Sequence, residues 1–418
     1  MLLLYIDPGT GSALFSILIG AAATLYFLGR ALLIRLKVLL SGGKAKFIAA
    51  HPIVIYSEGP QYWNLFRPVL DELEAREKKA LFLTSAADDP VFDAAYRHIK
   101  SEYIGEGNRA YGRLNMMQAV VCMMTTPGLD VYQLKRSRLV GRYVHLLHAL
   151  TDPAMYRLFS LDYFDTVLLT GDYQIRDTRR LERLRQLPEK ELITVGCTYL
   201  DEFAAELKKL PPREAVSPEQ NGLFTVLVSP SWGPQALLSR FGERLLDPLA
   251  ASGWNIIVRP HPHSKKVEGA AIEKLRERYR DNGRIRWDYE RENIHALSRA
   301  DIMISDFSGI IFDYSFLFDR PVIYVRQGMD LRPYDADDLG GRALDELWQF
   351  RSLKKFGVEL KEENLADIVC LVKEAANNAG LREARQEAGE ESWQHRGEAA
   401  KRIADYLVEI CKEFSAET

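Results

Sequence analysis

Arginine and histidine side chains that could bind a pyrophosphate stand together in the segment Arg259-Pro260-His261-Pro262-His263. Each proline biases the residue before it away from helical geometry, so we expect an extended chain in which every second residue shares a face. Arg259, His261 and His263 would then converge on one polyanion. The alternatives are a His-x-His zinc pair, which has no third ligand nearby in the sequence, and surface histidines without a role.

A second anion site is predicted within residues 301–313. The apolar triplet 302–304 is typical of a buried parallel strand, and a polar turn follows it that contains Ser305, Asp306, Ser308 and Gly309. We expect a helix to begin near Gly309, with Ser308 as its cap. The amide groups of residues 309–311 and the helix dipole would then bind a phosphate, with Asp313 one turn further on. The alternative is that the serines and Asp306 are ordinary caps.

A third polar segment, Ser229-Pro230-Ser231-Trp232-Gly233, follows the apolar run at residues 225–228. Small hydroxyl residues and a glycine suit a loop that passes close to a phosphate. The candidate binding residues in this segment are therefore Ser231, Trp232 and Gly233. The alternative is an ordinary connecting loop, for which the same residue types are typical.

The elements that must position these segments alternate between short β-rich runs and longer helical patterns, which is typical of α/β domains with parallel sheets. Ligands bind such sheets beyond the carboxyl ends of the strands, where all three segments lie. A polar, proline-containing break at residues 211–222 divides the alternation into two Rossmann-like lobes facing a cleft. The predicted division is an anchor with its basic flank (1–46), an N-terminal lobe (47–215), a C-terminal lobe (216–395) and a last helix (396–418).

The predicted strands are at residues 53–56, 81–84, 120–125, 144–147, 166–170 and 192–195 in the first lobe, and 224–229, 255–259, 285–287, 301–305 and 322–325 in the second.

The N-terminal segment predicts a membrane span. Residues 13–28 are uncharged and span roughly 25–30 Å as a helix, and the apolar character continues to about residue 34. No lysine or arginine precedes Arg30, which argues against a signal peptide, and several follow it. The positive-inside rule places the remainder in the cytoplasm, as a single-pass protein of the bacterial inner membrane. A buried or interfacial helix is the alternative.

Charge and cysteine spacing argue against a nucleic-acid-binding protein and a zinc-ribbon protein. The chain has 418 residues and a net charge of −3 with both signs interspersed, so no nucleic-acid footprint is evident. The four cysteines are far apart, which favours free thiols and excludes a zinc ribbon. Asp335-Ala336-Asp337-Asp338 contains a DxD spacing, but a solvated acidic turn is the better interpretation. We predict no required cofactor and no protein-held metal, although a divalent cation is possible.

In their order and spacing, the three segments and Arg320-Pro321-Val322 resemble the CDP-glycerol glycerophosphotransferase family, which builds teichoic-acid-like poly(alditol phosphate) polymers. Weaker similarity lies at His148-Ala149-Leu150-Thr151, at Gly171 and at Gly196-Cys197-Thr198-Tyr199-Leu200-Asp201. The resemblance implies a GT-B architecture. It also implies transfer of an alditol phosphate from a CDP-alditol to a hydroxyl on a lipid-linked or polyol-phosphate acceptor, with release of CMP.

By that resemblance, Arg259, His261 and the helix start at Ser308–Gly309 hold the pyrophosphate, and His148 faces the acceptor hydroxyl. His145 competes with His148 for that role. Two other functions stay open: a GT-B glycosyltransferase that uses a nucleotide-sugar, and an inactive membrane scaffold.

Overall fold

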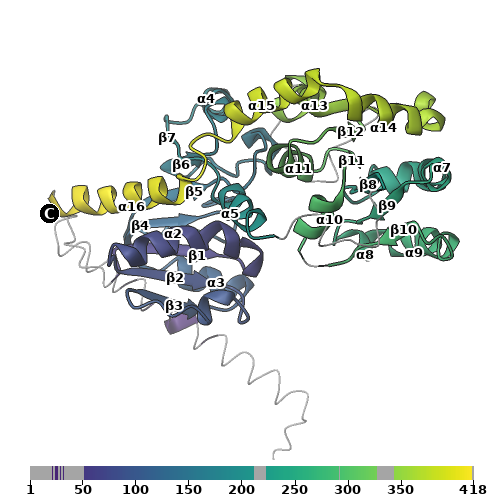
Figure 1. The fold of residues 1–418 in the computed structure, drawn as a ribbon. Coiled ribbons are helices and arrows are strands. Elements are labelled where there is room, and N and C mark those ends of the chain that lie inside the picture. Colours follow the sequence, from purple (N-terminus) through teal and green to yellow (C-terminus); the bar gives the residue numbers. More distant parts are fainter. Residues whose placement is uncertain are drawn as a thin grey trace, which may run out of the picture.

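The computed structural model describes residues 51–210, 223–290, 292–326 and 343–416, with a few residues between 21 and 32. The described chain forms two lobes, each built around a parallel sheet (Figure 1). The predicted α/β class with two Rossmann-like lobes is thereby confirmed.

The N-terminal lobe has its strands in the order β3-β2-β1-β4-β5-β6-β7. They are β1 (Ile53–Ser57), β2 (Ala80–Thr84), β3 (Ile99–Tyr103), β4 (Ala119–Met124), β5 (Val140–Leu146), β6 (Thr166–Leu169) and β7 (Glu191–Thr194). All of these pairings are parallel. Because helices cover both faces, β1 is buried along its whole length and lacks a polar face.

Helices of the N-terminal lobe are α2 (Trp63–Ala75), α3 (Gly107–Leu114), α4 (Tyr173–Arg185) and α5 (Thr198–Leu207). Successive side chains of β1 point to opposite faces, so Ile53 and Ile55 pack with α2 while Val54 and Tyr56 pack with α3. This alternation explains why an unbroken apolar run serves two separate cores.

The C-terminal lobe has the strand order β10-β9-β8-β11-β12-β13. The strands are β8 (Thr225–Val228), β9 (Asn255–Val258), β10 (Ile285–Trp287), β11 (Ile302–Ser305), β12 (Val322–Tyr324) and β13 (Gly357–Glu359). The order reverses between β8 and β11, which makes their carboxyl ends a switch point of the kind where such sheets bind ligands. All three predicted anion-binding segments begin at β8, β9 or β11, which are neighbours in the sheet.

Helices of the C-terminal lobe and tail are α7 (Leu237–Ala251), α8 (Ser264–Val267), α9 (Gly269–Arg278), α10 (Ile294–Arg299), α11 (Ile310–Phe318), α12 (Trp348–Arg351), α13 (Leu353–Phe356), α14 (Ile368–Asn377), α15 (Gly380–Ser392) and α16 (Ala399–Ala416). Figure 1 shows α16 running back from the C-terminal lobe along the N-terminal lobe. There Ile403, Leu407 and Ile410 join the same core as Phe66 of α2.

The crossing from α15 to α16 is held by Asp201 of α5. One oxygen of this carboxylate accepts from the Trp393 indole N–H and the Gly397 amide, both at 2.8 Å, and the other accepts from the Ala399 amide at 3.2 Å. Two glycines let the crossing chain approach the sheet: a Cβ on Gly171 would lie 2.4 Å from a backbone oxygen of that chain, and one on Gly196 would lie 2.5 Å away. Gly196 also has a φ of +97°.

A third apolar core joins the lobes to each other. Leu150, Cys197 and Leu200 of the N-terminal lobe pack in one buried cluster with Phe312 and Trp348 of the C-terminal lobe. Because both lobes contribute to this core, their relative position is part of the packed structure.

The predicted membrane span at residues 13–34 lies almost entirely outside the described residues. Among those that are described, no helix is long and apolar enough to cross a bilayer. All four cysteines are free thiols, as the sequence predicted.

Candidate functional site

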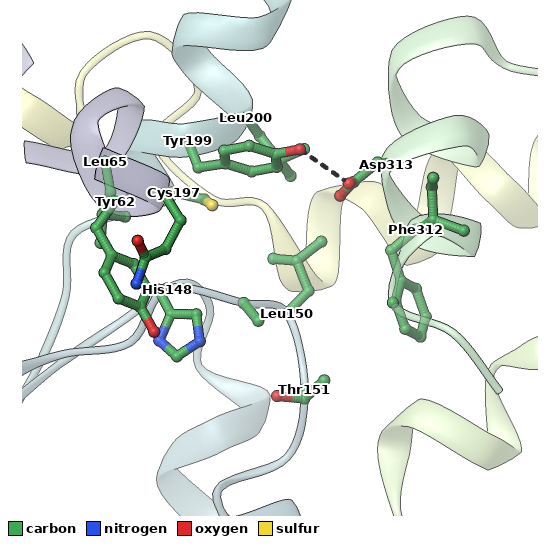
Figure 2. A pocket seen from close by; sticks show the side chains of 14 residues that line it. Tyr62, Leu65, His148, Leu150, Thr151, Cys197, Tyr199, Leu200, Phe312 and Asp313 are labelled. Atoms are coloured by element: carbon green, nitrogen blue, oxygen red, sulfur yellow. Dashed lines mark hydrogen bonds between the residues drawn. The ribbon is translucent and has the colours of Figure 1, made fainter. Parts of the chain in front are cut away.

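A cavity of about 300 Å³ opens between the lobes (Figure 2). Its walls come from residues near the start of α2, from the loop after β5, from the start of α5 and from the start of α11. The lining residues are Gln61, Tyr62, Leu65, His148, Ala149, Leu150, Thr151, Cys197, Tyr199, Leu200, Gly309, Ile310, Phe312 and Asp313. His148, Gly309 and Asp313, predicted from distant parts of the sequence, are thus brought into one cavity.

His148, rather than His145, faces this cavity. Its imidazole lies edge-on to Tyr62 and Tyr156, with ring centroids 5.4 and 6.1 Å away. Burial lowers the pKa of His148 to about 4, so the ring is neutral near pH 7 and able to accept a proton. His145 is 0% exposed within β5, where it packs against Phe164, and does not line the cavity.

The start of α11 presents two backbone amides, Gly309 and Ile310, that donate to no described residue. The prediction that three would be available is wrong, because the Ile311 amide donates to the Ser308 carbonyl at 3.2 Å. The prediction that Ser308 caps this helix is also wrong: Gly309 is the N-cap, and no side chain caps the helix. The space beside Gly309 is open, since a Cβ there would meet no atom within 4 Å. A phosphate can therefore approach these amides and the helix dipole.

Asp313 extends from the first turn of α11 toward Tyr199 of α5, as Figure 2 shows. The Tyr199 hydroxyl donates to Oδ2 of Asp313 at 3.2 Å and so links the two lobes. Burial raises the pKa of Asp313 to about 7, although the hydrogen bond from Tyr199 opposes this rise. Burial and the nearby Asp313 charge likewise raise the pKa of Tyr199, which keeps its proton available for donation.

The histidines after β9 lie on a turn. The chain is extended only as far as His261, and His263 adopts helical geometry just before α8, so the prediction of a fully extended segment is wrong. The two rings still lie 5.5 Å apart, and the His263 backbone N–H donates to Nδ1 of His261 at 3.1 Å. The proton of neutral His261 is therefore on Nε2, a donor for an anion. Burial and the His263 charge lower the pKa of His261 to about 4.

Arg259 is engaged with neighbouring protein groups. One guanidinium nitrogen lies 2.6 Å from the Asp288 carboxylate and the other donates to the Glu290 carbonyl at 2.7 Å. Both charged side chains of the pair are largely buried, 11% and 6% exposed. The immediate role of Arg259 in the structure is to hold the loop after β10 against the end of β9.

Asp306 and Ser305 join the loops at the switch point. Asp306 accepts from the amides of Ser231 and Leu237, both at 2.9 Å, and the Ser308 amide also donates to it. Ser305 donates its hydroxyl to the Ser229 carbonyl at 2.6 Å. Burial raises the pKa of Asp306, and these amide hydrogen bonds oppose that rise. The serine and aspartate therefore act through backbone groups that shape the anion site.

The loop after β8 reaches the histidine pair through Trp232, whose ring stacks on His263 at 5.5 Å. Ser231 is buried, and its amide is the group that Asp306 holds. Gly233 has a φ of +92°, which a side chain would disfavour, so it makes the turn that leads toward α7.

Tyr62, Thr151 and Tyr199 line the cavity but were not predicted as site residues. Tyr199 could have been found by applying the strand-end rule to β7, because it lies at the start of the helix that follows this strand. Tyr62 is the last residue of a short 3-10 helix (Pro60–Tyr62) rather than the first residue after a strand, and no sequence pattern pointed to it.

Within the part of the chain that the structure describes, no group of three or more His, Cys, Asp or Glu side chains could hold a metal ion. The DxD spacing at residues 335–338 lies outside that part.

The C-terminal lobe matches a family model. The model described as CDP-Glycerol:Poly(glycerophosphate) glycerophosphotransferase matches residues 239–345, a stretch that includes the Arg259–His263 and 301–313 segments. The resemblance inferred from the sequence is thereby confirmed over this stretch. No curated protein sequence matches the chain.

Solved structures share the fold. The wall teichoic acid polymerase TagF is 15% identical, with 93% of this chain and 97% of that chain covered at a TM-score of 0.58. A TagF variant soaked with CDPG gives 14% identity, coverages of 93% and 97%, and a TM-score of 0.55. UDP-GlcNAc 2-epimerase from Methanocaldococcus jannaschii is 12% identical, with 85% of this chain and 99% of that chain covered at a TM-score of 0.56. The family match over residues 239–345 supports an enzyme of the glycerophosphotransferase type, and the solved structures show the fold.

The first prediction concerns Arg259. Arg259→Met should destabilise the protein by about 3–5 kcal/mol, because Asp288 would be left buried and unpaired. Adding Asp288→Leu should restore most of that stability, and with it most of the turnover, if Arg259 acts by holding its loop. Urea unfolding and donor turnover of the wild type, both single variants and the double variant would measure this. A double variant that regains stability but stays inactive would show that Arg259 contacts the donor.

A second prediction follows from Asp313. Its raised pKa means that the folded state keeps a proton that the unfolded chain releases between about pH 4 and 7. The resulting stabilisation is complete below about pH 4 and is lost as pH rises through 7. Asp313→Asn does not titrate, so the stability of the wild type relative to this variant should fall by up to about 1.4 kcal/mol per pH unit between pH 5 and 7. Parallel urea midpoints across this range would contradict the assignment.

Proposed function

We propose that this chain, whose C-terminal lobe carries the glycerophosphotransferase family match, transfers an alditol phosphate from a CDP-alditol to a hydroxyl acceptor and releases CMP. Glycerol phosphate is the first choice of transferred group. The observation that carries the proposal is the interlobe cavity, in which the amide-bearing start of α11 and the imidazole of His148 line the same space.

The acceptor side of the reaction is assigned to His148. Nδ1 of this ring is buried without a described partner, so Nε2 is the nitrogen left to meet a substrate. Nε2 takes the proton of the acceptor hydroxyl as its oxygen bonds to the phosphorus that bears the alditol. Binding a pyrophosphate nearby would raise the lowered pKa of His148 and strengthen it as a base.

The leaving side of the reaction is assigned to the C-terminal lobe. The bond from the alditol-bearing phosphorus to the bridging oxygen breaks, and CMP departs with the electron pair. The Gly309 and Ile310 amides and the dipole of α11 are the groups that can stabilise the phosphate oxygens in the cavity. The Nε2–H of His261, which follows β9 outside the cavity lining, is assigned to the same pyrophosphate. Asp306 and Arg259 contribute by holding the loops that carry these groups.

The choice of donor rests on two findings of different kinds. The matched family is described by transfer from CDP-glycerol to poly(glycerophosphate), and TagF, which shares the fold, was solved after soaking with CDPG. A terminal hydroxyl of a lipid-linked or polyol-phosphate chain is the corresponding acceptor.

Membrane attachment is proposed from the sequence. The uncharged run at residues 13–28 and the lysines and arginines after it favour a single span, with the lobes on the cytoplasmic side. A CDP-alditol is a cytoplasmic nucleotide, which agrees with this orientation.

The test of the reaction is CMP release from CDP-glycerol by purified protein with a glycerol phosphate primer. His148→Ala and His148→Asn should each lower turnover by about 100-fold or more, because the acceptor proton would lose its base. His98→Ala is the matched control: this histidine pairs with Glu74 on the surface of the N-terminal lobe and should leave turnover unchanged.

Near-wild-type turnover of either His148 variant would remove this residue from the mechanism. Release of UDP or GDP from nucleotide-sugars, with no CMP from any CDP-alditol, would replace the proposed reaction by glycosyl transfer.

Attachment is tested separately by washing cell membranes with alkaline carbonate. The intact chain should stay in the pellet, whereas a chain that lacks residues 1–46 should be released. Release of the intact chain would contradict a membrane span.

A further inference from the structure

One wall of the interlobe cavity carries a carboxylate whose oxygens are not both used by the protein. Tyr199 donates to Oδ2 of Asp313, and no described residue donates to Oδ1. The side chain is half-buried and lines the cavity. A carboxylate oxygen that faces a largely enclosed cavity without a protein donor favours a ligand that brings a donor to it.

Tyr199 adds a second polar atom at the same place. Its hydroxyl donates to Asp313 and also hydrogen-bonds with Asn293, which holds the phenol in position. A hydroxyl oxygen has two lone pairs, so after accepting from Asn293 it retains one lone pair for a ligand. The two oxygens, one from each lobe, therefore present adjacent acceptors to the cavity.

The chemistry of the remaining lining narrows the class of ligand. Leu65, Leu150, Leu200 and Phe312 give the cavity apolar walls, and its volume of about 300 Å³ is at the small end for a ligand site. A phosphate placed against the carboxylate would be repelled, whereas hydroxyl groups on a short carbon chain would donate to it. The start of α11, one turn away on the same helix, is where a phosphate fits instead.

We propose that Asp313 and Tyr199 recognise the hydroxyl groups of the polyol unit attached to the phosphate, and so select a glycerol-like substrate. This inference deepens the proposed function and rests on it. The polyol has two possible sources, because the alditol of the donor and the terminal unit of a polyol-phosphate acceptor carry the same hydroxyl chemistry.

The experiment compares substrates with and without the hydroxyl. CDP-glycerol is compared with CDP-1,3-propanediol as donor, and a primer ending in glycerol phosphate is compared with one ending in propanediol phosphate. The measured quantity is the ratio of kcat/KM values for each pair. The proteins are the full-length wild type, Asp313→Ala, Asp313→Asn and Tyr199→Phe, with Glu273→Ala and Tyr289→Phe as controls on the exposed surface.

At pH 8, above the pKa of Asp313, the wild type should prefer the glycerol compound by about 10–100-fold, which is the value of a hydrogen bond to a charged group. Asp313→Ala should bring this ratio close to one, because its activity falls further on the glycerol compound than on the deoxy compound. The ratios for Asp313→Asn and Tyr199→Phe should lie between those of Asp313→Ala and the wild type, and the ratios for the two controls should match the wild type. The pair whose ratio collapses, donor or acceptor, identifies the source of the polyol.

A purely structural role for the Tyr199–Asp313 bond gives a different result. It would lower activity on both members of a pair equally, leave both ratios unchanged and thereby overturn the inference.

A binding measurement separates this inference from the proposed reaction. Calorimetry with glycerol 3-phosphate and with 1,3-propanediol phosphate reports recognition of the hydroxyl without turnover. Discrimination that Asp313→Ala abolishes would support the inference even if no CDP-alditol released CMP, a result that would defeat only the proposed function. Equal binding of the two compounds by the wild type would overturn the inference.

Discussion

The arrangement of the lobes depends on two carboxylates of the N-terminal lobe that accept backbone N–H groups from the C-terminal part of the chain. Asp152 accepts from the amides of Trp348 and Gln349 at 3.0 and 2.8 Å, and Asp201 accepts from the chain that leads into α16. Hydrogen bonds to a charged group are worth about 1.5–3 kcal/mol each. Between them lies the apolar core that both lobes share. The cavity has a defined shape because this joint sets the distance from α5 to α11.

The polar residues near the cavity form two groups, one that bonds to other protein groups and one that faces the cavity. Ser305, Asp306 and Arg259 bond to protein groups and shape the loops at the ends of β8, β9 and β11. His148 and the start of α11 face the cavity, and burial keeps the imidazole neutral because no described carboxylate stabilises its charge. Asp313 bonds to a protein group and also faces the cavity. Its Oδ2 accepts from Tyr199, and no described residue donates to its Oδ1.

Strands buried on both faces were predicted well because a short, unbroken apolar run between turn residues is typical of a buried parallel strand. The edge strands β3 and β13 were missed. Only the first residue of β3 is buried, so this strand lacks an apolar run. β13 has only three residues and begins at Gly357, whose missing side chain leaves room for the β12 backbone. The glycines at 171 and 196 were read as parts of a family pattern, whereas the structure uses them to admit the crossing chain. That use involves residues about 200 positions away, which local patterns do not report.

The sequence by itself determined the two-lobed α/β class, the strand ends at which the polar segments begin and the family resemblance. These follow from periodicity and strand-to-helix turns, which are local properties of the chain. Only the tertiary structure decided which of the predicted polar residues faces the cavity. Arg259 and Asp306 both follow strands at the edge where an anion site was predicted. In the structure, however, Arg259 pairs with Asp288, and Asp306 accepts from loop amides. The choice of His148 over His145 was settled similarly, because the first lies beyond the end of β5 and the second points into its core.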